Sequence, residues 1–455
     1  MKHFVLFFFC IVFISSKTSA QYSWQALSNA PKSYRLDDIY FLNPNLGWAI
    51  SPSYTIESPT KFGQIYRTTN GGTTWELQKD SSLTYYRSVG FADSLTGWVG
   101  NLGDTSRVNN IPTTPDTISF YHTVNGGFTW LPVLNIPSPK PKGICGISVV
   151  TDSVVYAYGR YFGPPVLLKT TDKGTSWTSH DMSTYASGLI DGYFFNKDTG
   201  FVSGSSPGKQ ATILSTFDGG KSWQTRYLST RSDTDGVWKL SFPSRKIGYA
   251  SVEHWAASPT FKSYFLKTTD GGLTWTEHQF VNSYDLQGIG FINDSTGWIG
   301  GWYETNFKTT NGGKTWNWDL NFGAVTAPYN YSGYYNVNRF RRFGDTLMYA
   351  SGNTVYKLRV SPTGINEQDN TIQQVENFPN PFSDQTTLSY SLSSAESMTV
   401  SIYDVLGECV FSNSLGLQNP GVHQFTLQVN LPSGIYYCVM SSEKNRLTKK
   451  ITIEK

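Results

Sequence analysis

Short stretches in which apolar and polar residues alternate recur along most of the chain, separated by polar turns. Two examples are RSVGFADSLTGWVGN at residues 87–101 and LQGIGFINDSTGWIGG at residues 286–301. Each joins an alternating stretch to a polar turn, after which a glycine-aromatic pair opens a second alternating stretch. Alternation with a period of two is typical of a strand with one buried face. Two such stretches around a polar turn therefore predict a β-hairpin.

A second, shorter pattern lies between these hairpins and ends in tryptophan, as in TTDGGLTW at residues 268–275. It occurs six times at intervals of 41 to 55 residues, the length of a four-stranded propeller blade. The Asp or Asn side chain is expected to accept backbone N–H bonds, the next glycine to adopt a positive φ, and the tryptophan to bury its ring and direct its N–H outward. The pattern is therefore predicted to be structural. Its Asp or Asn and Trp residues are Asn70, Trp75, Asn125, Trp130, Asp172, Trp177, Asp218, Trp223, Asp270, Trp275, Asn311 and Trp316.

The aromatic residue of the hairpins occurs seven times, once more than the tryptophan pattern. The N-terminal stretch YSWQALS, residues 22–28, accounts for the difference, because it resembles the strand that follows each copy and puts Trp24 at the tryptophan position. This stretch is predicted to be the outer strand of a last blade whose inner strands come from residues 338–360. Such pairing removes an open sheet edge. The predicted fold is all-β, with residues 21–360 forming a seven-bladed β-propeller closed by the N-terminal strand.

The tryptophan pattern resembles the Asp-box, or bacterial neuraminidase repeat. Its Thr-Thr-Asp-Gly-Gly-x-Thr-Trp form is most similar to propellers of the photosystem II assembly-factor type, and the resemblance covers about 340 residues. In sialidases and xyloglucanases that carry the box, it lies away from the substrate face, so the resemblance implies a structural role. The Arg-Ile-Pro motif of sialidases is absent from this sequence, which argues against that activity.

Strand-like alternation between Gly, Asn and Pro turns also fills residues 375–455, which follow a polar linker at residues 361–374. It predicts a small C-terminal β-sandwich. This part resembles the type A C-terminal sorting domain of the type IX secretion system of Bacteroidetes. The resemblance implies that the type IX machinery is a partner, that this domain is removed, and that the protein is extracellular or on the outer cell surface. The residues that carry it are Pro379, Asn380, Pro381, Phe382, Tyr403, Asp404, Gly407, Gly434, Ile435, Tyr436, Lys449 and Lys450.

Residues 1–20, MKHFVLFFFCIVFISSKTSA, have a basic start, an apolar run and small residues at the end. This order predicts a secretory signal peptide that is cleaved before Gln21. No other segment is long and apolar enough to predict a transmembrane helix. The 36 basic and 33 acidic residues nearly balance, which argues against nucleic acid as a partner.

Candidate chemical sites are few. The cysteines after the signal peptide form no metal or redox motif, although Cys409 and Cys438 could form a disulfide in an oxidising compartment. GSSPG matches a nucleophile-elbow pattern at Ser206, but a strand rather than a helix is expected after it. Asp233 and Asp235 resemble part of a calcium loop, for which a polar turn is the alternative. We therefore assign no catalytic residue, metal ligand or cofactor.

Ligand contacts are expected on the face opposite the tryptophan pattern, in loops that vary in length, such as residues 51–64, 101–119, 253–263 and 317–338. Aromatic rings beside amides in these loops suit sugars or an extended peptide. The candidate binding residues are Tyr85, Tyr86, Trp238, Trp255, Trp302, Tyr303, Tyr331 and Tyr334. The alternative is that such aromatic side chains fill gaps between blades. The favoured function is a binding or scaffold module for glycan or protein ligands. The alternative is a secreted glycoside hydrolase, which would need two suitably spaced carboxylates.

Overall fold

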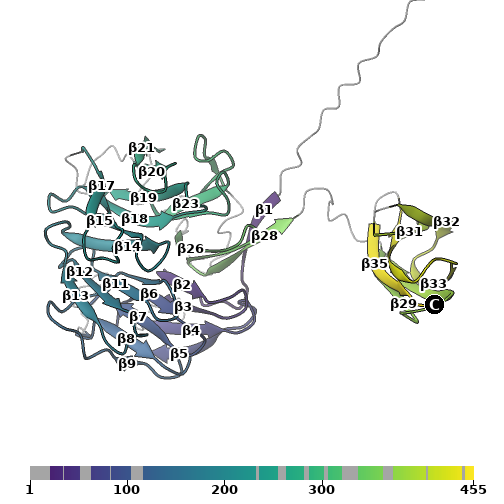
Figure 1. Cartoon of the computed structure of the whole chain (residues 1–455), viewed down its shortest axis with the longest axis horizontal. Coiled ribbons are helices and arrows are strands. Elements are labelled where there is room, and N and C mark those ends of the chain that lie inside the picture. Colours follow the sequence, from purple (N-terminus) through teal and green to yellow (C-terminus); the bar gives the residue numbers. More distant parts are fainter. Residues whose placement is uncertain are drawn as a thin grey trace, which may run out of the picture. The chain divides into compact units, whose positions relative to one another are not determined.

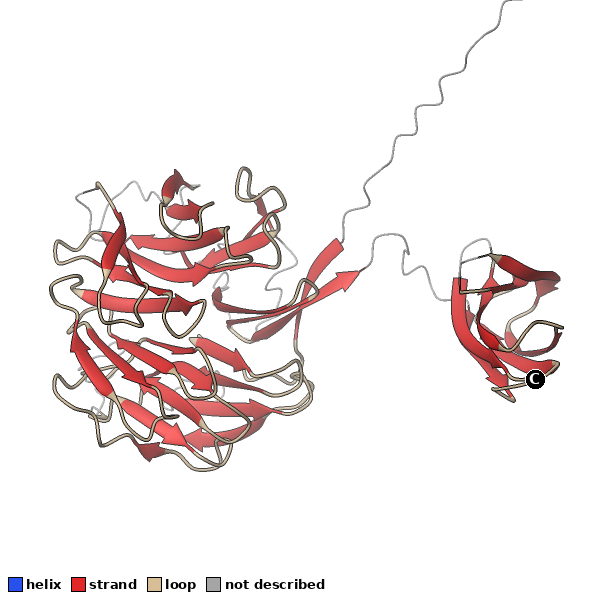
Figure 2. Cartoon of the chain, in the orientation of Figure 1, coloured by secondary structure: helices blue, strands red, loops and turns tan. Residues whose placement is uncertain are grey.

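Strands and turns make up the described part of the chain. The computed structural model describes residues 21–33, 35–51, 63–81, 84–103, 116–231, 235–254, 263–280, 286–301, 306–319, 337–361, 372–405, 408–442 and 446–455. These residues contain no helix (Figure 2). The chain divides into two compact units, one formed by residues Gln21–Ser361 and the other containing the described residues from Ile372 onward.

The first unit contains seven four-stranded antiparallel sheets among its described residues (Figure 1). Six of them use four strands in chain order, so that each fits a propeller blade. The strands of the first three are β2 (Asp38–Phe41), β3 (Gly47–Ser51), β4 (Gln64–Thr68), β5 (Glu76–Asp80); β6 (Tyr86–Phe91), β7 (Gly97–Asn101), β8 (Phe120–Thr123), β9 (Leu131–Pro132); and β10 (Gly146–Val149), β11 (Val155–Gly159), β12 (Val166–Thr170), β13 (Thr178–Asp181). Those of the next three are β14 (Gly188–Phe194), β15 (Gly200–Ser205), β16 (Ala211–Thr216), β17 (Gln224–Leu228); β18 (Asp235–Ser241), β19 (Gly248–His254), β20 (Tyr264–Thr268), β21 (Thr276–Gln279); and β22 (Leu286–Phe291), β23 (Gly297–Gly301), β24 (Phe307–Thr309), β25 (Asn317–Trp318).

The remaining sheet joins the two ends of the unit. It has the order β1 (Gln21–Ala26), β28 (Val355–Ser361), β27 (Leu347–Gly352) and β26 (Val337–Phe343). Trp24 of β1 lies opposite Leu358 of β28, which confirms the predicted pairing of the N-terminal strand. The first strand of each sheet contacts the first strand of the next, and β26 contacts β2, so these seven strands form a closed ring.

Each copy of the tryptophan pattern connects the third and fourth strands of a sheet. In all six copies the Asp or Asn Oδ1 accepts the backbone N–H four residues later, at 2.9–3.0 Å, as predicted. The next residue has a φ of 68° to 76° in the five copies where it is glycine, and Lys173 adopts 60° in the other. The indole N–H groups of Trp75, Trp223 and Trp275 donate to a glycine carbonyl of their own copy, so the prediction that they point outward was wrong for these three.

The hairpin aromatics fasten neighbouring sheets together. Trp48 stacks on Phe91 of the next sheet at 3.4 Å, and its indole N–H donates to the carbonyl of Gly126, 3.1 Å away. Tyr349 stacks in the same way on Phe41 at 3.8 Å, and its hydroxyl lies within hydrogen-bond distance of the carbonyls of Pro44, at 2.9 Å, and Gly71, at 3.2 Å. Gly126 and Gly71 are both glycines of the tryptophan pattern. The two sequence patterns therefore cooperate across each of these two joins, and the contacts are structural.

Asp270 tests this structural role. The Asp270→Ala variant is expected to lose about 1 kcal/mol of unfolding free energy, because the N–H and hydroxyl of Thr274 lose their acceptor. The Asp270→Asn variant is expected to lose much less, since asparagine fills this position in three other copies. Urea unfolding of the two variants measures the difference. Equal losses in both would contradict the assigned hydrogen bonds.

The second unit has two sheets around one core. One sheet has the order β29 (Ile372–Phe378), β30 (Gln385–Leu392), β33 (Gly421–Gln428). The other has the order β32 (Cys409–Gln418), β31 (Glu396–Tyr403), β34 (Gly434–Ser441), β35 (Arg446–Ile453). Their shared core includes the fully buried residues Leu388, Val400, Ile402, Met440 and Ile451.

The disulfide considered between Cys409 and Cys438 is not formed, and both are free thiols. Strand β31 separates them: Cys409 lies opposite Tyr403, whereas Cys438 lies opposite Ile402. Neighbouring residues of one strand point to opposite faces of a sheet. Cys438 is accordingly buried in the core, and Cys409 is exposed.

Candidate functional site

The structure describes three of the eight predicted binding residues. Tyr85 is half-buried, but Tyr86 and Trp238 are 0% and 4% exposed. Tyr86 and Trp238 are therefore packed inside the fold, which was the alternative interpretation of these aromatic residues. The other five predicted residues lie outside the described part of the chain: Trp255, Trp302, Tyr303, Tyr331 and Tyr334.

Trp238 is buried because the first strands converge at the centre of the ring. A register shift between Val237 and Lys239 marks an irregularity in β18 at this residue. Its ring lies 5.2 Å from the Arg87 guanidinium and 5.7 Å from the Tyr161 ring. Arg87 in turn forms an ion pair with Asp37. Trp238 is therefore a buried residue of strand β18, whereas the sequence analysis placed it in a loop.

An ionic network crosses the centre of the ring and joins four sheets. Arg339 of β26 donates to Asp38 of β2 at 2.9 Å and to both carboxylate oxygens of Asp191 of β14, at 2.9 and 3.2 Å. Lys239 of β18 lies 4.0 Å from Asp191. All four side chains are less than 10% exposed. Sequence reasoning missed this network, although each member is a charged residue inside an otherwise strand-like stretch.

Burial and charge set the protonation states of this network. Burial would raise the pKa of Asp191, but the positive charges of Arg339 and Lys239 outweigh it and hold that pKa below the usual range. Burial, reinforced by Arg339, lowers the pKa of Lys239 to about 7. Asp191 is thus an ionised partner of Arg339, which does not fit the proton-donating carboxyl of a glycosidase.

Two cavities open beside Arg341 and Arg342, next to this network. Their volumes are about 220 and 260 Å³. Both are lined by Arg339, Arg341, Arg342 and Tyr193, and no carboxylate is among the described residues that line them. They lie where the first strands end, which is the same end of each sheet as the tryptophan pattern and not the opposite face, where the sequence analysis expected ligand contacts.

The two arginines at these cavities are largely held by carbonyl groups. Arg341 donates to the Ile39 carbonyl at 2.9 Å, its Nη2 lies 4.0 Å from Asp38 Oδ1, and its guanidinium lies 5.0 Å from the Tyr40 ring. Arg342 donates to the carbonyls of Ile292 and Pro243, at 3.0 and 2.9 Å, and pairs with the exposed Asp345 at 3.3 Å. The side chains of Arg341 and Arg342 are 27% and 29% exposed. Fixed, partly exposed guanidinium groups of this kind suit an anionic ligand.

The other candidate chemical motifs have side chains that are occupied by hydrogen bonds and ion pairs within the fold. Ser206 donates to the Gln210 side chain at 2.8 Å and is followed by strand β16, so no nucleophile elbow is present there. The Asp235 carboxylate is occupied by Arg231 and by His254 Nδ1, the latter at 2.5 Å. Asp233, the other residue that resembles part of a calcium loop, lies outside the described residues. The described residues contain no cluster of three or more His, Cys, Asp or Glu that could hold a metal ion.

Solved structures similar to this chain support a β-propeller fold. YCF48 bound to D1 peptide has a TM-score of 0.51 and 17% identity, with 74% of this chain and 96% of that chain covered. YCF48 from Cyanidioschyzon merolae has a TM-score of 0.50 and 15% identity, with coverages of 75% and 100%. A GH74 xyloglucanase from Xanthomonas campestris has a TM-score of 0.41 and 10% identity, with coverages of 82% and 60%. At these identities the first two similarities indicate the fold alone.

The C-terminal unit provides the sequence-level match. No curated protein matched the chain in the comparison. The described residues contain no helix that is long and apolar enough to cross a membrane. Residues 376–454 match the family described as the secretion system C-terminal sorting domain. This match implies that the chain is exported by type IX secretion and is secreted or displayed on the cell surface.

Proposed function

We propose that residues 21–361 form a seven-bladed Asp-box β-propeller that acts outside the cell as a binding module for an acidic protein segment. The C-terminal unit, a small β-sandwich, would deliver it to the type IX machinery after a signal peptide at residues 1–20 has directed it across the inner membrane. The propeller assignment is supported by the ring of first strands and by the pairing of β1 with β28.

The observation that carries the binding role is the pair of cavities at Arg341 and Arg342. A carboxylate that enters either cavity would meet guanidinium groups already oriented by backbone carbonyls, so little side-chain entropy is lost on binding. The rings of Tyr40 and Tyr193 add apolar surface beside the charge. One of the similar propellers is described as bound to a peptide, which supports a peptide as the first ligand to test.

Binding can be measured by fluorescence polarisation with a labelled ten-residue peptide rich in aspartate and tyrosine. The full exported chain is expected to bind it, and the Arg341→Ala, Arg342→Ala double variant to bind about 10- to 100-fold more weakly, because charge-assisted hydrogen bonds are lost. The matched control is Arg359→Ala, an exposed arginine of β28.

Two results would overturn this proposal. One is an equal loss of affinity in the double variant and in the Arg359→Ala control, which would mean that the peptide responds only to overall charge. The other is the release of reducing ends from a polysaccharide, abolished by replacing a single carboxylate, which would support the glycoside hydrolase alternative.

A further inference from the structure

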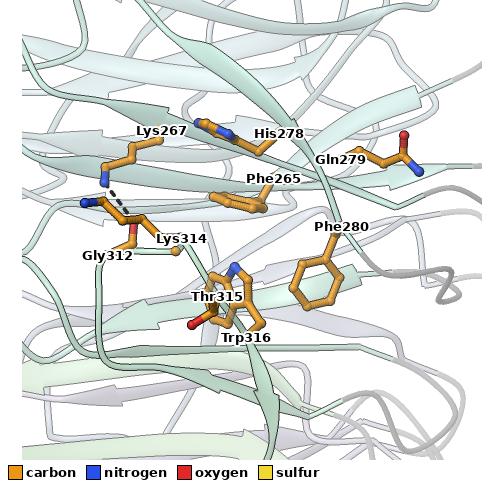
Figure 3. Close-up of a pocket in the computed structure, with 10 residues that line it drawn as sticks. Phe265, Lys267, His278, Gln279, Phe280, Gly312, Lys314, Thr315 and Trp316 are labelled. Carbon is orange, nitrogen blue, oxygen red and sulfur yellow. Dashed lines mark hydrogen bonds between the residues drawn. The ribbon is translucent and has the colours of Figure 1, made fainter.

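A third cavity lies away from the centre, between the outer strands of one sheet and the tryptophan pattern of the next. Its volume is about 530 Å³, within the usual range of ligand sites. Strands β20 and β21 form one side, and residues Gly312 to Trp316 form the other. Figure 3 shows Lys267 and Lys314 near one end and the rings of Phe280 and Trp316 near the other. We call this cavity the rim groove.

Aromatic rings supply the apolar surface of the rim groove. Phe265 stacks against His278 with ring centres 5.0 Å apart, and Trp316 meets Phe265 and Phe280 edge-on, at 5.5 and 5.4 Å. Phe280 also contacts Phe307 edge-on at 4.9 Å.

A series of ring contacts leads from the groove through the buried Phe307 to Trp318. Its ring lies 4.2 Å from Phe307 and is 58% exposed. Trp318 does not line the groove itself, but its exposed ring is a suitable platform for the apolar face of a sugar.

Two lysines give the rim groove its positive charge. Lys267 Nζ donates to the Gly312 carbonyl at 2.7 Å, which fixes the ammonium group at the groove wall and leaves it further protons to donate (Figure 3). Burial and the nearby Lys314 lower the pKa of Lys267, whereas Asp294 opposes that shift. Burial and Lys267 lower the pKa of His278, so this ring is a neutral hydrogen-bonding group near pH 7. No carboxylate lines the groove among the described residues.

An equivalent join connects the sheet of β10 to β13 with the sheet of β14 to β17, and its side chains are different. There Lys169 also donates to a box glycine, Gly219, at 2.7 Å. However, Leu167 occupies the strand position of Phe265, because both lie opposite a histidine of the next strand. Lys221 stands where Lys314 stands in the rim groove. Both joins therefore contain the two lysines. The Phe265 ring, in contrast, is present in the rim groove and replaced by Leu167 in the other join.

We propose that the rim groove binds an acidic carbohydrate, with a uronic acid carboxylate at Lys267 and Lys314 and the apolar faces of its sugar rings on Trp316 and Trp318. The polar groups of His278, Gln279 and Thr315 surround this position and can bond sugar hydroxyls. This site goes beyond the peptide-binding role, since it shares no residue with the two central cavities.

Calorimetry of the full exported chain with a panel of uronic acid trisaccharides tests the proposal. The panel contains galacturonate, glucuronate and mannuronate oligomers, each paired with its carboxyl-reduced neutral counterpart. At least one acidic trisaccharide is expected to bind, and its neutral counterpart to bind about tenfold or more weakly, because the charge-assisted bonds to the lysines are lost. Lys314→Gln and Trp318→Ala are each expected to weaken binding by at least fivefold, and both residues are exposed enough for the fold to survive.

Lys221→Gln is the matched control, and it is expected to leave binding unchanged. Equal weakening by Lys221→Gln and Lys314→Gln would overturn the site, as would equal affinity for the neutral sugars or no binding across the panel. The Arg341→Ala, Arg342→Ala variant separates the two proposals. It is expected to lose the acidic peptide and to keep the acidic sugar, so either site can fail while the other stands.

Discussion

Replacing Arg339 with methionine is expected to lower the free energy of unfolding by about 3–5 kcal/mol, the usual cost of removing one partner from a buried ion pair. The guanidinium lies within 3.2 Å of carboxylate oxygens of both Asp38 and Asp191. These two residues belong to β2 and β14, on different sheets from Arg339 itself. Without the arginine, two buried negative charges lose their main counter-ion.

Urea unfolding of the full exported chain measures this loss. Arg359→Met is the matched control, because it removes an exposed arginine from the same sheet, and it is expected to change stability by less than about 0.5 kcal/mol. Adding Asp191→Asn to Arg339→Met should restore part of the lost unfolding free energy, because it removes one of the two buried carboxylate charges left without Arg339. A loss below about 1 kcal/mol in Arg339→Met would contradict a central role for this ion pair.

The parts of the fold that depend on local sequence were predictable. The hydrogen bonds of Asp270 involve residues no more than four positions away, so turn chemistry alone predicts them. The pairing of β1 with β28 is a long-range feature, yet counting the two repeated patterns against each other predicted it. The repeat supplied the long-range information that a single strand lacks.

The central network was not predictable in the same way, because its members come from four sheets that are far apart in the sequence. A signal was nevertheless present: Asp38, Asp191, Lys239 and Arg339 are charged residues in first strands, next to apolar residues. Such residues need a partner when they are buried. The sequence offered no means of pairing them with one another.

The exposure of the candidate binding residues was predicted least well, for a physical reason. Tyr86 and Trp238 resemble loop residues in the sequence, but both lie in first strands, β6 and β18, where packing against neighbouring residues buries their rings. Trp318, by contrast, lies in an outer strand, where no further strand of the sheet covers it. Its exposure depends on the position of the strand within the sheet, which the residue pattern alone did not give.

Lys239 is expected to make the stability of the protein rise with pH above neutrality. Burial lowers its pKa from 10.5 to about 7, so between these values the unfolded chain binds a proton that the folded chain does not. Stability rises with pH wherever the unfolded state binds more protons. With 1.36 kcal/mol for each pKa unit, the rise over this window is on the order of 5 kcal/mol.

The Lys239→Met variant isolates this effect, because methionine keeps much of the buried volume and cannot titrate. Unfolding free energies of both proteins are measured between pH 6 and pH 10, and the wild-type value minus the variant value removes the contributions of all other groups. This difference is expected to be most negative near pH 6, where wild-type Lys239 is charged in both states, and to climb toward pH 10. Lys246→Met, at an exposed lysine, should give a flat difference. If the difference for Lys239→Met varies by less than about 1 kcal/mol across this range, the prediction is wrong. Lys239 would then stay charged in the folded protein, held in that state by the carboxylate of Asp191.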